Sequence, residues 1–218
     1  IAYLARHTNN AKSTKEASSQ QNNLTLPEIN FFSWFLLWKV PNIRLLLNFA
    51  KCDENWELED DLICSVFEKT MSSKFPQWIV LFPEVNIWSQ ENAYLQKIQS
   101  EKYFLPILSN LLYPRFSGFF NAVHAIKSAS TYRFNELLDI TIAYQSSEIR
   151  EDDSKIYTPT LMEIFASESQ ITVTINISTK PISRIPIKRM KLERYLEHVW
   201  RSKDELLSQL QESTKKSS

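Results

Sequence analysis

Two short motifs contain the residues best suited to bind a charged ligand. Glu84 ends the motif Phe-Pro-Glu at 82–84, directly after an apolar stretch, and Arg115 is the second residue of the motif Pro-Arg-Phe-Ser-Gly-Phe at 114–119. A fixed guanidinium can hold a phosphate through two parallel hydrogen bonds, and a carboxylate after a strand can accept a bond from a substrate hydroxyl. Spacing alone suits Arg115 equally well to pairing with a carboxylate that fixes a loop, and for Glu84 it favours an exposed acid at a strand end.

The histidines do not have the spacing of a catalytic pair. The chain has three of them, and the residues five positions after His7, His124 and His198 are Lys12, Ala129 and Lys203. None can therefore be paired at that spacing with a carboxylate that orients the imidazole as a general base. No Cys/His cluster has the spacing of a metal site, so we expect no metal ligands and structural roles for these histidines.

Composition excludes several classes of protein. Gly118 is the only glycine, whereas a P-loop, a dinucleotide fingerprint and a Gly-x-Ser-x-Gly elbow each need two or more close together. Lys and Arg total 25 and Asp and Glu total 25, a balance that argues against a nucleic-acid partner. The two cysteines, Cys52 and Cys64, suggest reduced thiols rather than a disulfide scaffold. No uncharged apolar run reaches the length of a transmembrane helix.

Hydrophobic periodicity predicts an α/β fold: a mixed sheet flanked by helices, ending in an amphipathic C-terminal helix. We expect strands at 78–82, 137–144 and 170–178, the last with one wet face. Four helices are expected, at 57–73, 91–103, 118–128 and 188–211.

The length suits a single domain over residues 1–218. Polar composition predicts a loop or insertion at 8–23, an acidic surface loop at 145–160 and a frayed tail at 212–218. The apolar run at 29–38 suits either a core segment or a helix in the membrane interface, and the core is the favoured interpretation.

Taken together, the motifs at 82–84 and 114–119 resemble those of the lysophospholipid (lysophosphatidic acid-type) glycerolipid acyltransferases. The likeness is to the branch that includes the lysophosphatidylinositol and lysocardiolipin enzymes. The stretches Leu-Asp-Ile-Thr-Ile-Ala-Tyr at 138–144 and Trp-Arg-Ser-Lys-Asp-Glu at 200–205 resemble two further segments of that family. Several motifs in the family's order are more specific than any one alone.

This resemblance implies the acyltransferase-type fold and transfer of an acyl group from acyl-CoA to a lysophospholipid hydroxyl, in phospholipid biosynthesis or remodelling. Acyl-CoA would be a co-substrate, with no further cofactor, and the reaction would occur at an intracellular membrane, by the family's habit the endoplasmic reticulum. Glu84 and Arg115 would bind the phosphate-bearing end of the acceptor, together with Phe82, Pro83 and Asn86.

The sequence also departs from the family. The His-x-x-x-x-Asp pair that supplies the family's general base is absent from these residues, and residues 1–6 resemble the stretch just after it. We therefore expect the pair to lie upstream of Ile1 and the chain alone to be inactive. Val85 replaces a family glycine and Glu54 a family arginine, which leaves an alternative: a divergent, non-catalytic relative that binds lipids or protein partners.

Overall fold

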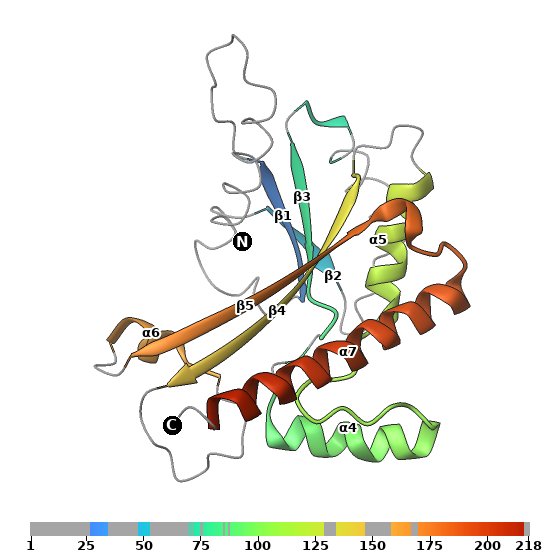
Figure 1. Cartoon of the computed structure of the whole chain (residues 1–218). Helices are drawn as coiled ribbons and strands as arrows, with labels where there is room; N and C mark the ends of the chain where they lie inside the picture. Colours follow the sequence, from blue (N-terminus) through green and yellow to red (C-terminus); the bar gives the residue numbers. More distant parts are fainter. Residues whose placement is uncertain are drawn as a thin grey trace. The chain divides into compact units, whose positions relative to one another are not determined.

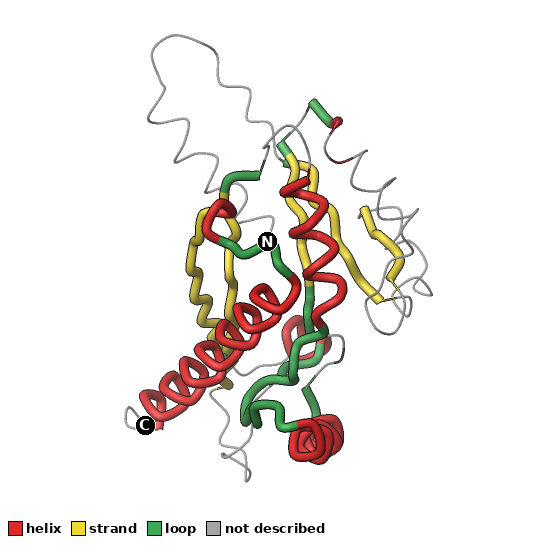
Figure 2. Tube along the Cα trace, turned by 90° about the vertical axis from the view of Figure 1, so that its right-hand side faces the viewer, coloured by secondary structure: helices red, strands yellow, loops and turns green. Residues whose placement is uncertain are grey.

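Figures 1 and 2 show the elements of a computed structural model of the chain, which groups into two compact units. We call residues 1–85 and 115–133 the sheet unit, and residues 86–114 and 134–218 the hairpin unit. The mixed α/β class is confirmed. The residues that the structure describes are 27–34, 48–52, 70, 72–74, 76–84, 86, 88–128, 134–146, 158–166 and 170–215.

A three-stranded parallel sheet forms the centre of the sheet unit. β1 (Glu28–Trp34) lies between β2 (Asn48–Cys52) and β3 (Gln77–Leu81), so β3 is an edge strand of the sheet that the described residues form. The Asn30 amide donates a hydrogen bond of 2.7 Å to Oε1 of Gln77 and so joins β1 to β3 through side chains as well. The sheet confirms the strand predicted at 78–82.

Two sequence predictions are corrected by this sheet. Residues 29–34 of the apolar run at 29–38 are a strand, so the interfacial helix considered for them is wrong. β2 was not predicted, because the run that contains it has no alternation of polar and apolar residues to mark a strand. The helix predicted at 57–73 lies mostly outside the described residues, although Thr70 and Ser72 are helical.

The sheet unit also contains helix α5 (Phe116–Ser128). Its buried residues recur at helical spacing and form one stripe: Gly118, Phe119, Ala122, Val123 and Ile126. Gly118 does not have a positive φ. It lies buried in the first helical turn, where the absence of a Cβ leaves room for close packing.

A long C-terminal helix and a β-hairpin dominate the hairpin unit. β4 (Glu136–Ser146) pairs antiparallel with β5 (Ile171–Pro181), and a 3-10 turn η2 (Ile182–Arg184) leads into α7 (Arg189–Lys215). The buried residues of α7 form a single apolar stripe of Leu192, Leu196, Val199, Trp200 and Leu207. The predicted amphipathic helix is confirmed, and it continues through the first part of the tail expected at 212–218.

Two shorter helices complete this unit. α4 (Gln90–Tyr103) begins at Ser89, whose hydroxyl accepts a hydrogen bond of 3.1 Å from the Asn92 N–H, as a helix cap does. It ends at Phe104, which adopts the left-handed conformation with φ 55°. α6 (Leu161–Ala166) was not predicted, because six residues are too few to display a period.

The strands form two separate sheets in the described part of the chain, not the single mixed sheet that was expected. The hairpin also differs in burial from the prediction. On β5, the apolar side chains of Val173, Ile175 and Ile177 are 42–48% exposed, although their alternation predicted a dry face. Residues 145–146 of the predicted acidic loop belong to β4, while 147–157 and the predicted insertion at 8–23 lie outside the described residues.

Candidate functional site

The Phe-Pro-Glu motif begins at the residue that follows β3. Loops that follow the carboxyl ends of parallel strands commonly hold ligand-binding groups, because the strands fix the loop while leaving its side chains outside the sheet. Phe82 is 46% exposed, and Pro83 and Glu84 are half-buried. The motif is thus held at the edge strand with its side chains accessible from solvent.

The Pro-Arg motif contacts this loop through the backbone. The N–H of Arg115 donates a hydrogen bond of 2.9 Å to the carbonyl oxygen of Pro83, across 31 intervening positions of sequence. Pro114 is buried, which anchors the turn before Arg115. The structure therefore brings together four of the five residues that the sequence singled out: Phe82, Pro83, Glu84 and Arg115.

Arg115 stands directly before α5, at the end where the helix dipole is positive. Its side chain is exposed, and within the described residues its guanidinium has no hydrogen-bond or ion-pair partner. An anion at this point could accept bonds from the guanidinium and from backbone N–H groups together. The arrangement is therefore suited to a phosphate monoester or diester.

The remaining predicted residue is placed differently. Asn86 is exposed, but it falls in the hairpin unit, so its role in the same site stays a prediction. Val85 and Glu54, the two departures from the family pattern, lie outside the described residues. Among the described residues, no three His, Cys, Asp or Glu side chains are grouped so that they could hold a metal ion.

A second polar cluster lies in the hairpin unit, between the hairpin and α7. Nζ of Lys203 on α7 is 2.5 Å from a carboxylate oxygen of Asp139 on β4 and donates a 2.7 Å hydrogen bond to the carbonyl of Ile140. Both charged side chains are largely buried, at 11% and 16% exposed. The pair joins the motif stretch at 138–144 to that at 200–205, which the sequence analysis had noted without assigning them contacts.

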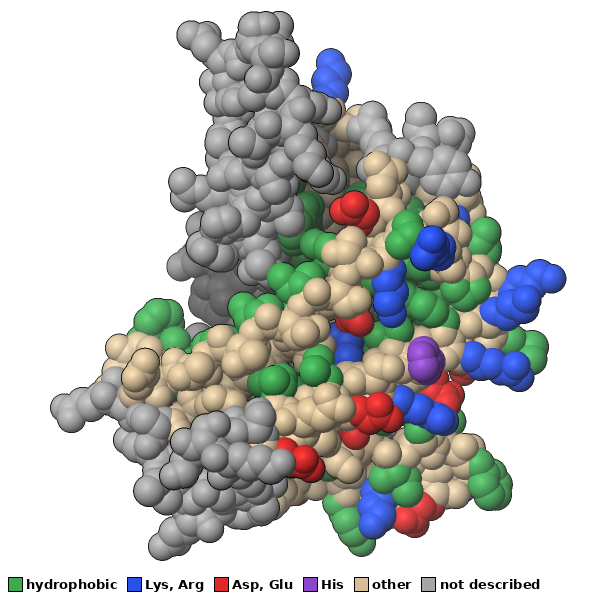
Figure 3. Space-filling model, viewed as in Figure 1, with side chains coloured by type: hydrophobic (Ala, Val, Ile, Leu, Met, Phe, Trp, Pro, Cys, Tyr) green, Lys and Arg blue, Asp and Glu red, His purple; other side chains and the backbone are tan. Residues whose placement is uncertain are grey.

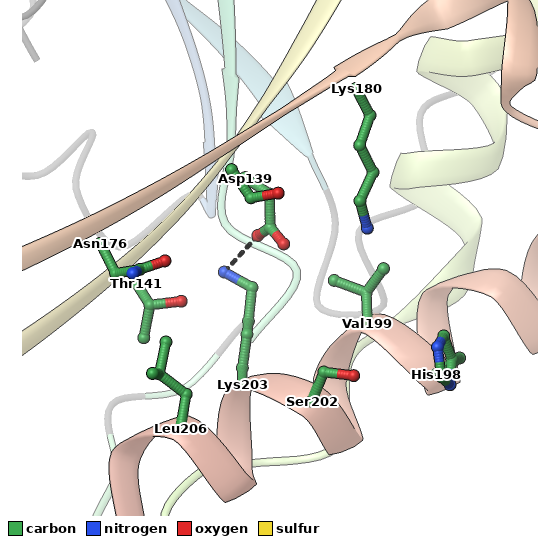
Figure 4. Close-up of a pocket in the computed structure, with 10 residues that line it drawn as sticks. Asp139, Thr141, Asn176, Lys180, His198, Val199, Ser202, Lys203 and Leu206 are labelled. Atoms are coloured by element: carbon green, nitrogen blue, oxygen red, sulfur yellow. Dashed lines mark ion pairs between the residues drawn. The ribbon is translucent and has the colours of Figure 1, made fainter. Parts of the chain in front are cut away.

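Figure 4 shows the hollow of about 170 Å³ beside this ion pair. Lys203 points from α7 to Asp139, and Lys180 extends from β5 toward the same space, with His198 and Ser202 along α7. Since the carboxylate of Asp139 already balances one lysine, the pair serves first as a bond between strand and helix. His198 has no acid partner among these groups that would make it a general base.

Two tyrosines of this unit have perturbed acidity. Burial raises the pKa of Tyr113 to about 12, assisted by the negative charges of Glu197 and Glu193. Burial also raises the pKa of Tyr195, with a further contribution from the charge of Asp139. Both phenols therefore stay protonated and neutral at physiological pH.

Asp204, the residue after Lys203, contacts a different part of the unit. Its carboxylate accepts hydrogen bonds from the backbone N–H of Ser109, at 3.0 and 3.1 Å, and of Asn110, at 2.6 Å. The Asn110 side chain in turn donates to the Asp204 carbonyl at 3.0 Å and to the Ser208 hydroxyl at 2.8 Å. The segment that leads to Pro114 is thereby fixed to α7 within the hairpin unit.

Sequence reasoning did not find these structural contacts. The pairing of Asp139 with Lys203 joins positions 64 residues apart, and no local period indicates it. The one available signal was that Asp139 is the single charged residue in the largely apolar stretch at 138–144. No helix within the described ranges is long and apolar enough to cross a bilayer.

Comparison with known proteins supports the predicted resemblance. A probable 1-acyl-sn-glycerol-3-phosphate acyltransferase 5 from Arabidopsis thaliana is 22% identical over 163 residues, which cover 75% of this chain and 40% of that protein. A lysophosphatidylinositol acyltransferase 10 from Caenorhabditis elegans is 26% identical over 129 residues, covering 59% of this chain and 30% of that protein. The chain thus spans less than half the length of these relatives.

No protein-family model and no solved structure matches the chain. Both relatives are nevertheless named as glycerolipid acyltransferases, the family that the motifs at 82–84 and 114–119 resemble. The predicted resemblance is confirmed: in sequence, this chain is a relative of the glycerolipid acyltransferases.

Proposed function

We propose that this protein transfers an acyl group from acyl-CoA to a free hydroxyl of a lysophospholipid at a membrane surface, by the family's habit that of the endoplasmic reticulum. In the reaction, the acceptor oxygen forms an ester bond with the acyl carbon, the carbon–sulfur bond breaks, and the hydroxyl proton passes through a general base to the departing thiolate. The base in this proposal is a His-x-x-x-x-Asp pair outside these 218 residues, since no histidine here has that spacing.

The observation that carries the proposal is the hydrogen bond of 2.9 Å between Arg115 N–H and the Pro83 carbonyl. It joins two segments that resemble the family's acceptor-binding motifs, and it places an exposed guanidinium at the start of α5 beside the loop of Glu84. Arg115 would hold the acceptor phosphate, and Glu84 would accept a hydrogen bond from a headgroup hydroxyl.

The test is an acyl-transfer assay on the protein encoded by the complete native transcript, with lysophosphatidic acid and lysophosphatidylinositol as acceptors. Because the joining bond uses the backbone N–H, Arg115→Ala keeps it and removes only the guanidinium. We expect kcat/KM for the acceptor to fall about tenfold to a hundredfold, as when a charge-assisted hydrogen bond is lost, with the KM for acyl-CoA unchanged.

Arg201→Ala is the matched control, since Arg201 is an exposed arginine of the hairpin unit whose partner is Glu197 on the same helix. It should leave both acceptor and acyl-CoA kinetics unchanged. Equal losses in the two variants would contradict the assignment of Arg115, and no transfer to any lysophospholipid would contradict the proposed reaction.

The replacement of the family's glycine and arginine by Val85 and Glu54 favours a second candidate, a non-catalytic relative that binds lipids. In that case Val85→Gly combined with Glu54→Arg would leave the complete protein inactive but still able to bind lysophospholipid. A rise from a low existing turnover would instead favour the enzyme. A transcript without the His-x-x-x-x-Asp pair would also favour the non-catalytic candidate.

A further inference from the structure

The start of α7 carries a concentration of positive charge in a chain whose net charge is zero. Residues 184–194 contain five basic side chains and one acid, Glu193, hence a local charge of +4. We call the following exposed residues the basic patch: Arg184, Lys188, Arg189, Lys191 and Arg194. In Figure 3, Lys and Arg side chains stand out from the surface in this region.

Two exposed apolar side chains lie among these charges. Ile187 is 52% exposed and Met190 is 69% exposed, each next to a lysine or arginine in sequence. A surface that served only to bind a polyanion would gain nothing from a methionine side chain held in water. Alternating cationic and apolar side chains match the interface of a bilayer, where the charges meet lipid phosphates and the apolar groups enter the acyl boundary.

The basic side chains also lie at the end of α7 where positive charge is unfavourable for a helix. The first turn of α7 contains no acid, and Arg189 and Lys191 stand near its positive end. Cations at this end are unfavourable to the helix in water. An anionic surface next to this end would make the electrostatic energy of the positive charges favourable, because the surface attracts both the basic side chains and the positive end of the helix dipole.

The C-terminal end of α4 lies on the same side of the hairpin unit as the start of α7 in Figures 1 and 2. Its cap, Phe104, is 96% exposed and has φ 55°, a conformation that costs energy for any residue with a Cβ. Tyr103 and Ile107 beside it are 61% and 55% exposed. Gly would relieve the backbone at Phe104, so the strained, fully exposed aromatic points to a use outside the fold.

From these observations we propose that the basic patch, with Ile187, Met190 and Phe104, docks the hairpin unit on an anionic bilayer. Charge complementarity selects phospholipids with net negative headgroups, and the exposed apolar side chains select a bilayer over a soluble polyanion. Docking needs neither acyl-CoA nor catalysis, so this inference and the proposed function can fail separately.

The test is co-sedimentation of the 218-residue protein with vesicles of phosphatidylcholine alone and of phosphatidylcholine with phosphatidylserine. We expect binding to the mixed vesicles only, and we expect it to weaken as salt shortens the screening length. Lys188→Gln with Lys191→Gln should reduce the partition coefficient roughly 25-fold, at about fivefold for each charge near the surface. Equal binding to both vesicle types would overturn the proposal.

Lys74→Gln with Lys97→Gln is the matched control: two exposed lysines outside the patch, and the same change of charge. Its partition coefficient should stay within about twofold of the unaltered protein, because electrostatic attraction falls off within a screening length. A loss equal to that of the patch variant would show that only total charge matters, which would overturn the proposal.

Two substitutions that remove exposed apolar side chains distinguish binding to a bilayer from binding to a soluble polyanion. Met190→Ser and Phe104→Gly remove exposed side chains, so each should weaken vesicle binding roughly tenfold while heparin binding stays unchanged. Phe104→Gly should also raise the melting temperature by relieving the left-handed strain, which shows that its loss of binding is not a loss of fold. Heparin binding as tight as vesicle binding, with both insensitive to Met190→Ser, would overturn the bilayer in favour of a soluble polyanion.

Discussion

Arg115 contributes its backbone and its side chain to separate tasks. The backbone N–H is bonded to the Pro83 carbonyl and holds the two motifs together, while the guanidinium is exposed before α5. The bond can be formed by every residue except proline, which has no N–H. The bond between the two motifs therefore does not require arginine at position 115, and any such requirement would come from the side chain.

Tyr113 makes the stability of the protein depend on pH in the alkaline range. Its pKa is raised to about 12 in the folded protein by burial and by Glu197, compared with about 10 in an unfolded chain. The folded state thus holds the proton more tightly. The stabilisation is complete below about pH 10 and is lost as the pH rises to about 12.

We expect the free energy of unfolding, measured in urea, to fall more steeply over this alkaline range for the unaltered protein than for Tyr113→Phe. Tyr94→Phe is a control, because Tyr94 is 66% exposed on α4. It should follow the unaltered protein. If the free energy of unfolding of Tyr113→Phe fell with pH as steeply as that of the unaltered protein, the Tyr113 phenol would be titrating as it does in water.

At the scale of residues, the sequence predicted the groups that could bind a ligand but not the groups that fix them. Glu84 and Arg115 were found because motif types are local, and the structure brings their loops together. The partners of Lys203 and Asp204 were not found, because both bonds join segments far apart in sequence. Such contacts depend on the packing of α7, which a single sequence does not specify.

At the scale of elements, α7 positions much of the hairpin unit. Consecutive residues on a helix point about 100° apart, so Lys203 and Asp204 reach different neighbours. Lys203 bonds to β4, and Asp204 bonds to the backbone at 109–110. One turn of helix therefore fixes both the hairpin and the segment before the Pro-Arg motif.

Removing Lys203 should be costly, because it leaves the Asp139 carboxylate largely buried without its partner. We expect Lys203→Met to lower the free energy of unfolding by about 3 kcal/mol, and the added change Asp139→Asn to recover part of that loss. Urea unfolding of the two single variants and the double variant measures the coupling.

Arg201→Met provides the comparison on the same helix. Its 2.6 Å ion pair with Glu197 is exposed on the arginine side, so its loss should cost only about 0.5 kcal/mol. Similar costs for the two substitutions would show that the bond between Lys203 and Asp139 is screened like a surface pair, contrary to its burial.

The elements that were predicted are those with a long regular pattern. α7 and α5 were found from their helical pattern and β3 from a continuous apolar run, whereas α4 was predicted as a helix in a polar stretch. β2 was missed because its residues neither alternate nor form a continuous apolar run, and α6 was missed because six residues are too few for a period to be recognised. On β5, the alternation predicted the strand, but the apolar face expected to be dry is half-exposed, and Asn176 and Ser178 on the other face are exposed as well.

At the scale of the whole molecule, the chain passes between the sheet unit and the hairpin unit three times, after residues 85, 114 and 133. We therefore predict that the two units unfold as one cooperative unit, which the single domain expected from length also requires. Native-state hydrogen exchange of Lys203→Met tests this. If the two units unfold together, exchange should accelerate as much in β1 and β3 as in α7.

Arg201→Met should leave the exchange of all these elements near that of the unaltered protein. Acceleration confined to the hairpin unit in Lys203→Met would mean that the two units unfold independently, and the single-domain prediction would then be wrong.

The half-exposed isoleucines and valine of the hairpin have a practical consequence for work with this chain. Ile142, Val173, Ile175 and Ile177 are each 42–48% exposed on two paired strands of high β-propensity. A surface of this kind promotes aggregation at high concentration and on surfaces used in purification. Substituting Ile175 with threonine, which keeps the β-branched shape, would be the first change to improve solubility while leaving both motifs and the basic patch untouched.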